Sequence, residues 1–89
     1  MPVEREVTVR NREGLHFRPI MQLVETAARF DAAVTLHGAE RQADARSPME
    51  LLMLVATQGS RLRLVAEGQD AQRVVDALAA LFEAGFSEN

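Results

Sequence analysis

The residues best suited to chemistry lie in one short segment, 14–19, which reads Gly-Leu-His-Phe-Arg-Pro. A neutral imidazole is a nucleophile near neutral pH, since free histidine titrates at a pH of about 6.5. Arg18 carries a planar guanidinium that matches the oxygens of a phosphate in pairs. These side chains have the chemistry to take up a phosphoryl group, with His16 able to carry it and Arg18 able to pair with its oxygens.

The sequence after His16 predicts an α-helix that begins at the histidine. Apolar residues at positions 20, 23, 24, 27 and 28 form one stripe on a helix from about residue 17 to residue 29 or 30. Pro19 fits only the first turn, where its missing N–H leaves no hydrogen bond unmade. The unpaired N–H groups and the dipole at a helix start attract an anion. We expect them, with Arg18, to keep His16 neutral and then to stabilise its phosphate.

Both residues also have a plain structural interpretation. His16 could be a polar residue at the start of a helix, and Arg18 could be a solvated side chain of the first turn. A cation is disfavoured at this end of a helix by the dipole. The unfavourable placement of Arg18 beside His16 therefore favours a functional role.

The remaining patterns predict an α+β fold. Alternating apolar residues indicate strands near 3–9, 34–36 and 62–66, and Gly38 permits a tight hairpin into a short, polar strand near 41–45. Ser47 to Glu50 forms a capping box for a short helix that ends by residues 58–59. Asp70 is expected to cap a last helix that Gly85 closes. The order βαββαβα predicts a four-stranded antiparallel sheet with three helices on one face.

Composition narrows the functional classes. A chain of 89 residues is the length of one small domain, which we expect to span residues 1–89. A net charge of −3 gives no reason to expect a nucleic-acid partner, and the lack of cysteine excludes thiol chemistry. The longest apolar run, 51–56, is too short to span a bilayer, and residues 1–6 lack the apolar stretch of a signal peptide. We expect a cytoplasmic protein.

Segment 14–19 resembles the active-site segment of the HPr family, the histidine-containing phosphocarrier proteins of the bacterial phosphotransferase system, which reads Gly-Leu-His-Ala-Arg-Pro. Residues 46–54 are similar to the family's segment around its regulatory serine, and residues 58–59 to the turn that follows. Residues 81–86 resemble the ending of the nitrogen-related branch. The resemblance covers nearly the whole chain in order, and it implies an open-faced β-sandwich.

The resemblance also implies a function. His16 would accept a phosphoryl group from enzyme I and pass it to an A-type protein, either in a sugar permease or in a regulatory system. Such a protein is a carrier, not an enzyme that turns over alone, and it needs neither a metal nor an organic cofactor. The resemblance further implies a monomer.

Ser47 has two interpretations. As the first residue of a capping box, its presence is fully explained by a bond to the helix. In many Gram-positive relatives the matching serine is phosphorylated by a dedicated serine kinase. Pro48 stands where those proteins carry isoleucine or leucine, and Glu50 where they carry glycine, which disfavours recognition by such a kinase.

An apolar surface beside His16 is a second expectation. Phe17 stands in place of the family's alanine and falls off the buried stripe, so we expect it to be partly exposed. With Ile20, Pro48, Met49 and Leu52 it would form a patch, and the matching patch of the family docks the donor and acceptor proteins. The alternative is that Met49 and Leu52 pack inward.

Two other functions remain open at this point. The chain could be a regulatory binding module that keeps the fold and acts through its apolar patch, although the presence of both His16 and Arg18 counts against this. It could also be a small α+β binding domain with an accidental resemblance. That interpretation predicts an inert His16 and does not explain the ordered match from Gly14 to Phe86.

Overall fold

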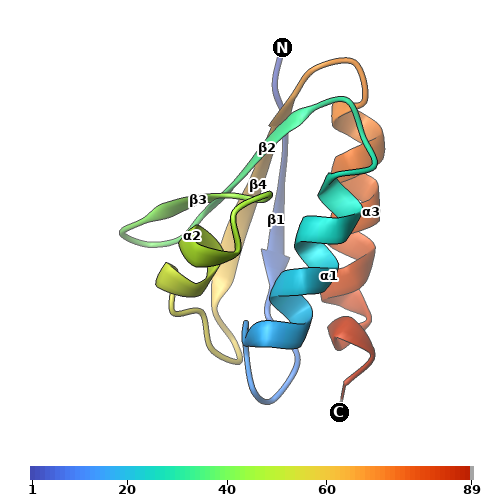
Figure 1. Ribbon diagram of the computed structural model, residues 1–89. Helices are drawn as coiled ribbons and strands as arrows, with labels where there is room; N and C mark the ends of the chain where they lie inside the picture. The colour runs from blue at the N-terminus through green and yellow to red at the C-terminus, as the bar shows by residue number, and fades with distance from the viewer. Residues whose placement is uncertain (89) are drawn as a thin grey trace.

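The structure is a computed structural model that describes residues 1–88. Four strands form one antiparallel sheet in the order β1-β4-β2-β3 (Figure 1). The strands are Val3–Thr8 (β1), Ala33–His37 (β2), Gln42–Asp44 (β3) and Arg61–Glu67 (β4). The helices are Phe17–Ala27 (α1), Pro48–Met53 (α2) and Ala71–Glu83 (α3), with a 3₁₀ turn at Gly85–Ser87 (η1). The predicted order and the antiparallel sheet are confirmed.

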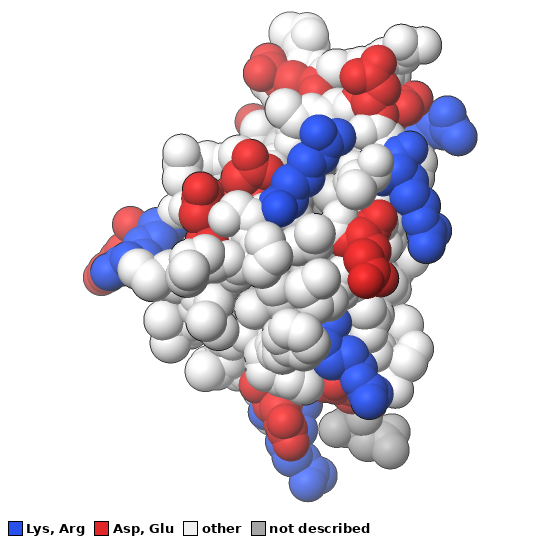
Figure 2. Space-filling view, viewed as in Figure 1, with Lys and Arg blue, Asp and Glu red and all other residues white. Residues whose placement is uncertain are grey.

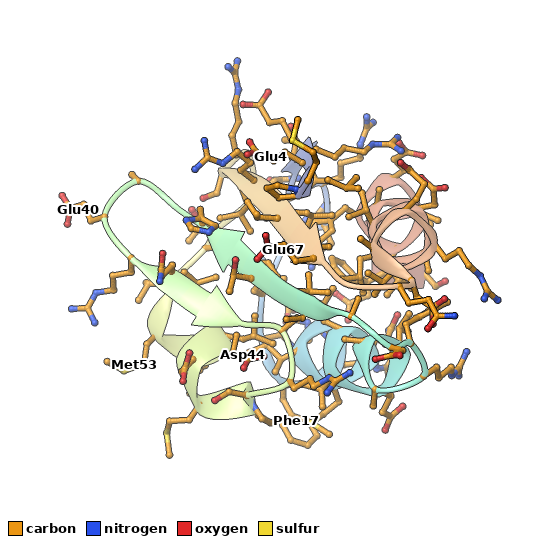
Figure 3. The ribbon with its side chains drawn as sticks, turned by 90° about the horizontal axis from the view of Figure 1, so that it is seen from above. Glu4, Phe17, Glu40, Asp44, Met53 and Glu67 are labelled. Carbon is orange, nitrogen blue, oxygen red and sulfur yellow. The ribbon has the colours of Figure 1, made fainter. Side chains whose placement is uncertain are left out.

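The helices lie on one side of the sheet, and α1 and α3 run side by side (Figures 1 and 3). Strand β4 shows why one side is covered: Leu62, Leu64 and Ala66 are buried, whereas Arg61 and Glu67 are exposed. Successive side chains of a strand point to opposite faces, so the alternation gives one apolar and one polar face. The buried face and the apolar stripes of α1 and α3 form the core.

Helix α1 ends at Ala27, earlier than predicted from the apolar stripe. The N–H groups of Arg29 and Phe30 donate to the carbonyl oxygens of Thr26 (3.1 Å) and Ala27 (3.2 Å). These i→i−3 bonds are typical of a tightened helix end. Ala28, the last residue of the predicted stripe, is exposed, whereas Phe30 packs against the core beyond the end of the helix.

Helix α2 is also shorter than predicted, because it ends at Met53 and not near residue 58. Val55 has a left-handed backbone (φ 51°), which no helix continues through. Directly after Val55, the Ala56 carbonyl accepts the Leu15 N–H at 3.0 Å. The segment after α2 therefore holds the loop that precedes α1. This tertiary contact ends the helix earlier than the local sequence predicts.

Two predicted caps are only partly confirmed. The Ser47 hydroxyl accepts the Glu50 N–H at 3.2 Å, as expected for the first residue of a capping box. The Glu50 carboxylate accepts the Asp44 N–H (2.9 Å) and does not return to Ser47. Asp70 precedes α3, but its carboxylate caps no backbone N–H of that helix; it accepts the Asp31 N–H at 2.8 Å and the Arg73 guanidinium at 3.3 Å. Asp70 therefore joins two loops, and the predicted side-chain cap is wrong.

Val55 gives a stability prediction. A β-branched side chain is strained at positive φ, whereas asparagine tolerates this conformation, and the Val55 side chain is exposed, so little packing is lost. We expect Val55→Asn to raise the free energy of unfolding by about 1 kcal/mol. Urea denaturation with an unchanged m-value measures the gain. A lower midpoint than that of the wild type would contradict the strain.

No helix within residues 1–88 is both long enough and apolar enough to cross a membrane.

Candidate phosphoacceptor site

His16 is the residue immediately before α1, where its carbonyl accepts the Ile20 N–H at 3.1 Å. Its backbone is extended, and its side chain makes no capping bond to the helix. Phe17 and Arg18 are the first helical residues, so the helix offers no partner for their N–H groups. The structure therefore places the histidine beside the positive end of a helix dipole, as predicted.

The loop before His16 is held against the segment after α2. The Gly14 N–H donates to the Asn11 carbonyl (3.2 Å), and the buried Leu15 donates to Ala56 as described above. Gly14 has φ +72°, and a Cβ there would lie 2.5 Å from the Ala56 carbonyl oxygen. Only glycine fits such a left-handed position in close contact with backbone. This contact fixes the loop that leads to His16.

A carboxylate that the sequence patterns did not indicate lies on the imidazole. Both carboxylate oxygens of Glu88 lie 3.0 Å from His16 Nε2, across 72 residues of sequence. The Glu88 side chain is only 16% exposed in this contact. Figure 1 shows the corresponding backbone, in which the η1 turn after α3 comes near the loop that enters α1.

Asn11 connects this carboxylate to the loop. Its Nδ2 donates to the Gly14 carbonyl (2.7 Å) and to Glu88 Oε1 (3.1 Å). The side chain is almost fully buried, and among residues 1–88 its Oδ1 has no hydrogen-bond partner. No local pattern in the sequence shows that Asn11 is buried.

Glu88 is ionised at neutral pH. The hydrogen bond from His16 is the main cause that lowers the pKa of Glu88 below its ordinary value of 4.5. Burial acts in the opposite direction, while the bond from Asn11 and the charges of His16 and Arg18 lower the pKa further. Because the folded-state pKa is below the unfolded one, these contacts stabilise the fold above pH 4.5, and the stabilisation is lost as the pH falls through the folded value.

The other charged groups near the imidazole differ in exposure. Glu13 Oε1 lies 3.9 Å from His16 Nε2, too far for a hydrogen bond, and this side chain is 75% exposed. Arg18 is exposed and makes no hydrogen bond or ion pair with the rest of the described chain, residues 1–88. Its charge is close enough to act on Glu88. The Arg18 guanidinium is therefore available to an anion at the site.

The five residues of the predicted apolar patch line one shallow hollow beside the site: Phe17, Ile20, Pro48, Met49 and Leu52. Ile20 is buried and forms its floor, whereas Phe17, Met49 and Leu52 are 77%, 72% and 57% exposed. The alternative in which Met49 and Leu52 pack inward is therefore wrong. An uncharged area covers α2 and the start of α1 in Figure 2, and Phe17 projects from this side in Figure 3. We call these five residues the apolar patch.

Ser47 lies beside this patch, directly before Pro48. Its hydroxyl is used as the cap of α2, and its side chain is partly exposed. Residues 1–88 hold no cluster of three or more histidine, cysteine or acidic side chains that could bind a metal ion. The site is thus an imidazole, a carboxylate, an arginine and a helix end.

Comparison with known proteins identifies the class. A family model described as "PTS HPr component phosphorylation site" matches residues 3–84. The chain is 42% identical over 86 residues to the phosphocarrier protein NPr of Shewanella violacea, covering 97% of this chain and 94% of that protein. It is 38% identical to the phosphocarrier protein HPr of Xylella fastidiosa strain Temecula1, covering 98% of each. The crystal structure of HPr-C-His from Thermoanaerobacter tengcongensis superimposes with a TM-score of 0.93, at 32% identity and 98% coverage of each chain.

The chain belongs to the HPr family, the phosphocarrier proteins of the phosphotransferase system. It is therefore a phosphocarrier, and the interpretation of an accidental resemblance is wrong.

Proposed function

We propose that His16 is the phosphoryl acceptor and that Nδ1 is the atom that attacks. The position of Nε2 against an ionised carboxylate carries this proposal. An ionised carboxylate has no proton to donate, so Nε2 must carry the hydrogen, and a neutral ring then has its lone pair on Nδ1.

The reaction follows from this arrangement. The Nδ1 lone pair forms a bond to phosphorus while the bond from phosphorus to the donor's histidine breaks, and the donor nitrogen keeps that electron pair. Charge spreads over the phosphoryl oxygens in the transition state. The N–H groups at the start of α1 and the Arg18 guanidinium stabilise this charge. Each helix-end contact is worth only about 0.3–1 kcal/mol, which suits a carrier that must also release the group.

The partners follow from the family. Enzyme I would donate the phosphoryl group, and A-type proteins would accept it, both in the cytoplasm and with this chain as a monomer. The apolar patch lies beside His16, so a protein docked on it would bring its own histidine to the site. Exposed patches of this kind are typical of protein interfaces, and Met49 can adapt to several partners.

The nitrogen-related branch is the better-supported assignment within the family. Residues 81–86 resemble its ending, and the relative from Shewanella violacea is an NPr. The acceptor would then be a regulatory A-type protein and not a sugar permease. Ser47 keeps its structural role in this proposal, because its hydroxyl caps α2 and Pro48 and Glu50 disfavour a serine kinase.

Leu52→Glu tests the docking role of the apolar patch. A charge placed in a desolvated contact with enzyme I is expected to weaken binding at least tenfold, a loss of about 1.4 kcal/mol. Met53→Glu is the matched control, because Met53 is the next residue of α2, is similarly exposed and lies outside the hollow. Titration calorimetry with enzyme I measures both. Equal weakening by the two variants would contradict docking on this patch.

Phosphorylation from phosphoenolpyruvate tests the proposed acceptor. The protein is incubated with catalytic enzyme I, and the added mass is located by mass spectrometry. We expect one phosphoryl group on His16, labile in acid and stable in base. An adduct at Ser47 or at another residue would refute the assignment of His16.

A further inference from the structure

The strongest unassigned feature of the molecule is the contact between its carboxyl-terminal segment and His16, and the inference drawn from it rests on the proposed function. We propose that Glu88 is a positioning residue of the phosphoryl transfer: its carboxylate holds the Nε2–H of His16, orients Nδ1 for attack and balances the positive charge that the ring acquires when it is phosphorylated.

The geometry of the contact supports an orienting role. Nε2 lies 3.0 Å from each carboxylate oxygen, so a ring rotation that broke the contact would lose a charge-assisted hydrogen bond. The ring is thereby held with its Nδ1 edge turned away from Glu88. A free histidine at a helix start has no such restraint, since the His16 side chain makes no bond to α1 itself.

The backbone that carries Glu88 is strained. Gly85, Phe86 and Ser87 all have positive φ, at 60°, 56° and 61°, and two of them are not glycine. Such conformations cost free energy and persist only where the surroundings hold them. The Phe86 ring is buried and packs edge-on against Phe82, with 4.9 Å between the centroids. Packing of Phe86 in the core therefore stabilises this strained turn, and the turn places Glu88 against His16.

Asn11 is a second support for the carboxylate. It donates to Glu88 Oε1 and to the Gly14 carbonyl from a buried position, so it joins Glu88 to the loop that carries His16. An accidental contact between a surface carboxylate and a histidine does not require a hydrogen bond from a buried amide, so the Asn11 bond favours a specific role for Glu88. His16 is thus held by the Glu88 carboxylate, and Glu88 is in turn held by Asn11. Reactive imidazoles in other proteins are positioned by the same kind of series, in which a carboxylate holds the ring and a further group holds the carboxylate.

The charge that develops on the ring during the reaction explains why Glu88 is expected to raise the rate of transfer. Before transfer, the ring is neutral, with its proton on Nε2. When the Nδ1 lone pair becomes the N–P bond, the proton stays on Nε2 and the ring becomes a phosphoimidazolium with one positive charge. The carboxylate then faces a cation, so its hydrogen bond strengthens during the reaction. Interactions that strengthen toward the transition state raise the rate, and a carboxylate behind an attacking imidazole acts in this way in hydrolases.

Glu13 provides the matched comparison. It carries the same charge near the same nitrogen, but it is exposed and 0.9 Å farther away (3.9 Å against 3.0 Å). Arg18 is the nearby cation. Since exposed charges are strongly screened by water and salt, removal of the Glu13 charge is expected to have little effect. A difference between Glu88 and Glu13 therefore isolates the hydrogen bond from general electrostatics.

The experiment compares Glu88→Ala, Glu88→Gln and Glu13→Gln with the wild type. The initial rate of phosphoryl uptake from enzyme I is measured at equal, subsaturating carrier concentration, with circular dichroism as the check of folding. We expect Glu88→Ala to be about tenfold slower or more, Glu88→Gln to be intermediate, and Glu13→Gln to stay within about twofold. An amide can accept the Nε2 hydrogen bond but does not balance the charge, which separates the two effects.

Imidazole ¹⁵N NMR provides a readout that a merely structural role would not change. At a pH where the ring is neutral, wild-type His16 is expected to show a protonated Nε2 and an unprotonated Nδ1. In Glu88→Ala the two shifts should move toward each other as the second tautomer becomes populated, whereas Glu13→Gln should match the wild type.

The outcomes separate this inference from the function on which it rests. If Glu88→Ala is phosphorylated on His16 at the wild-type rate with unchanged ¹⁵N shifts, the role of Glu88 is refuted and the proposed function stands. If the wild type takes up no phosphoryl group on His16, the proposed function fails first, and the inference fails with it.

Discussion

His16→Ala is expected to abolish phosphoryl uptake from phosphoenolpyruvate and enzyme I, while His37→Ala keeps the wild-type rate. The chain has only these two histidines, so the pair of variants removes the same chemical group from two places. His16 lies at the start of α1 with Nε2 on a carboxylate, and no other described group offers a nucleophile in that setting. The measurement is the phosphorylated fraction by mass spectrometry over time.

The control histidine lacks every feature of the site. His37 is the last residue of β2, and its Nε2 lies 2.9 Å from the Thr35 hydroxyl. No helix begins beside it in the sequence, so it has no helix end to stabilise a phosphate. Residual acid-labile phosphate in His16→Ala, or its loss in His37→Ala, would show that the acceptor has been misassigned.

Gly14→Ala is expected to have the largest effect on stability among substitutions at the site. The new Cβ would lie 2.5 Å from the Ala56 carbonyl oxygen and 3.0 Å from the Thr57 Cα, so backbone must move. A non-glycine residue at φ +72° adds a conformational cost of about 1–2 kcal/mol. We expect a total loss of about 3 kcal/mol, a large part of the 5–15 kcal/mol that stabilise a typical domain. Phosphoryl uptake should fall as well, because the same loop carries His16.

Gly59→Ala is the matched control for this substitution. Gly59 also has positive φ (+91°), but a Cβ there meets nothing within 4 Å. It should therefore lose only the conformational cost, about 1–2 kcal/mol, and keep its rate of phosphoryl uptake. Urea denaturation measures both variants. Equal destabilisation would mean that the close contact of Gly14 with Ala56 does not constrain the loop.

Local signals explain what could be predicted from the sequence. Period-two alternation located β1, β2 and β4, the hairpin signal at Gly38 located β3, and Pro19 located the start of α1 within its first turn. These signals depend on neighbouring residues only. The Ser47 hydroxyl caps α2 as expected, since the capping residue and the N–H that donates to it are three residues apart. The apolar patch was predicted because Phe17 falls off a buried stripe that the sequence itself defines.

Tertiary contacts explain what could not be predicted. Helices α1 and α2 end earlier than predicted because residues just beyond them make tertiary contacts. Phe30 packs against the core, and Ala56 accepts a hydrogen bond from Leu15. Glu88 is 72 residues from His16, and no spacing rule joins them. The left-handed turn at Phe86 brings them together, and no pattern predicts positive φ at a phenylalanine. The only available signal was the likeness of residues 81–86 to a family ending, which says nothing of a contact.

The central claim is that the chain carries a phosphoryl group on His16 between two proteins, and a relay experiment tests it most directly. The protein is phosphorylated with labelled phosphoenolpyruvate, separated from enzyme I and mixed with an A-type acceptor of the nitrogen-related branch. We predict that the label leaves His16 and appears on a histidine of the acceptor, while the carrier returns to its unphosphorylated mass. Label that stays on His16 in the presence of both this acceptor and a sugar-permease A domain, or that appears only as inorganic phosphate, would contradict the account.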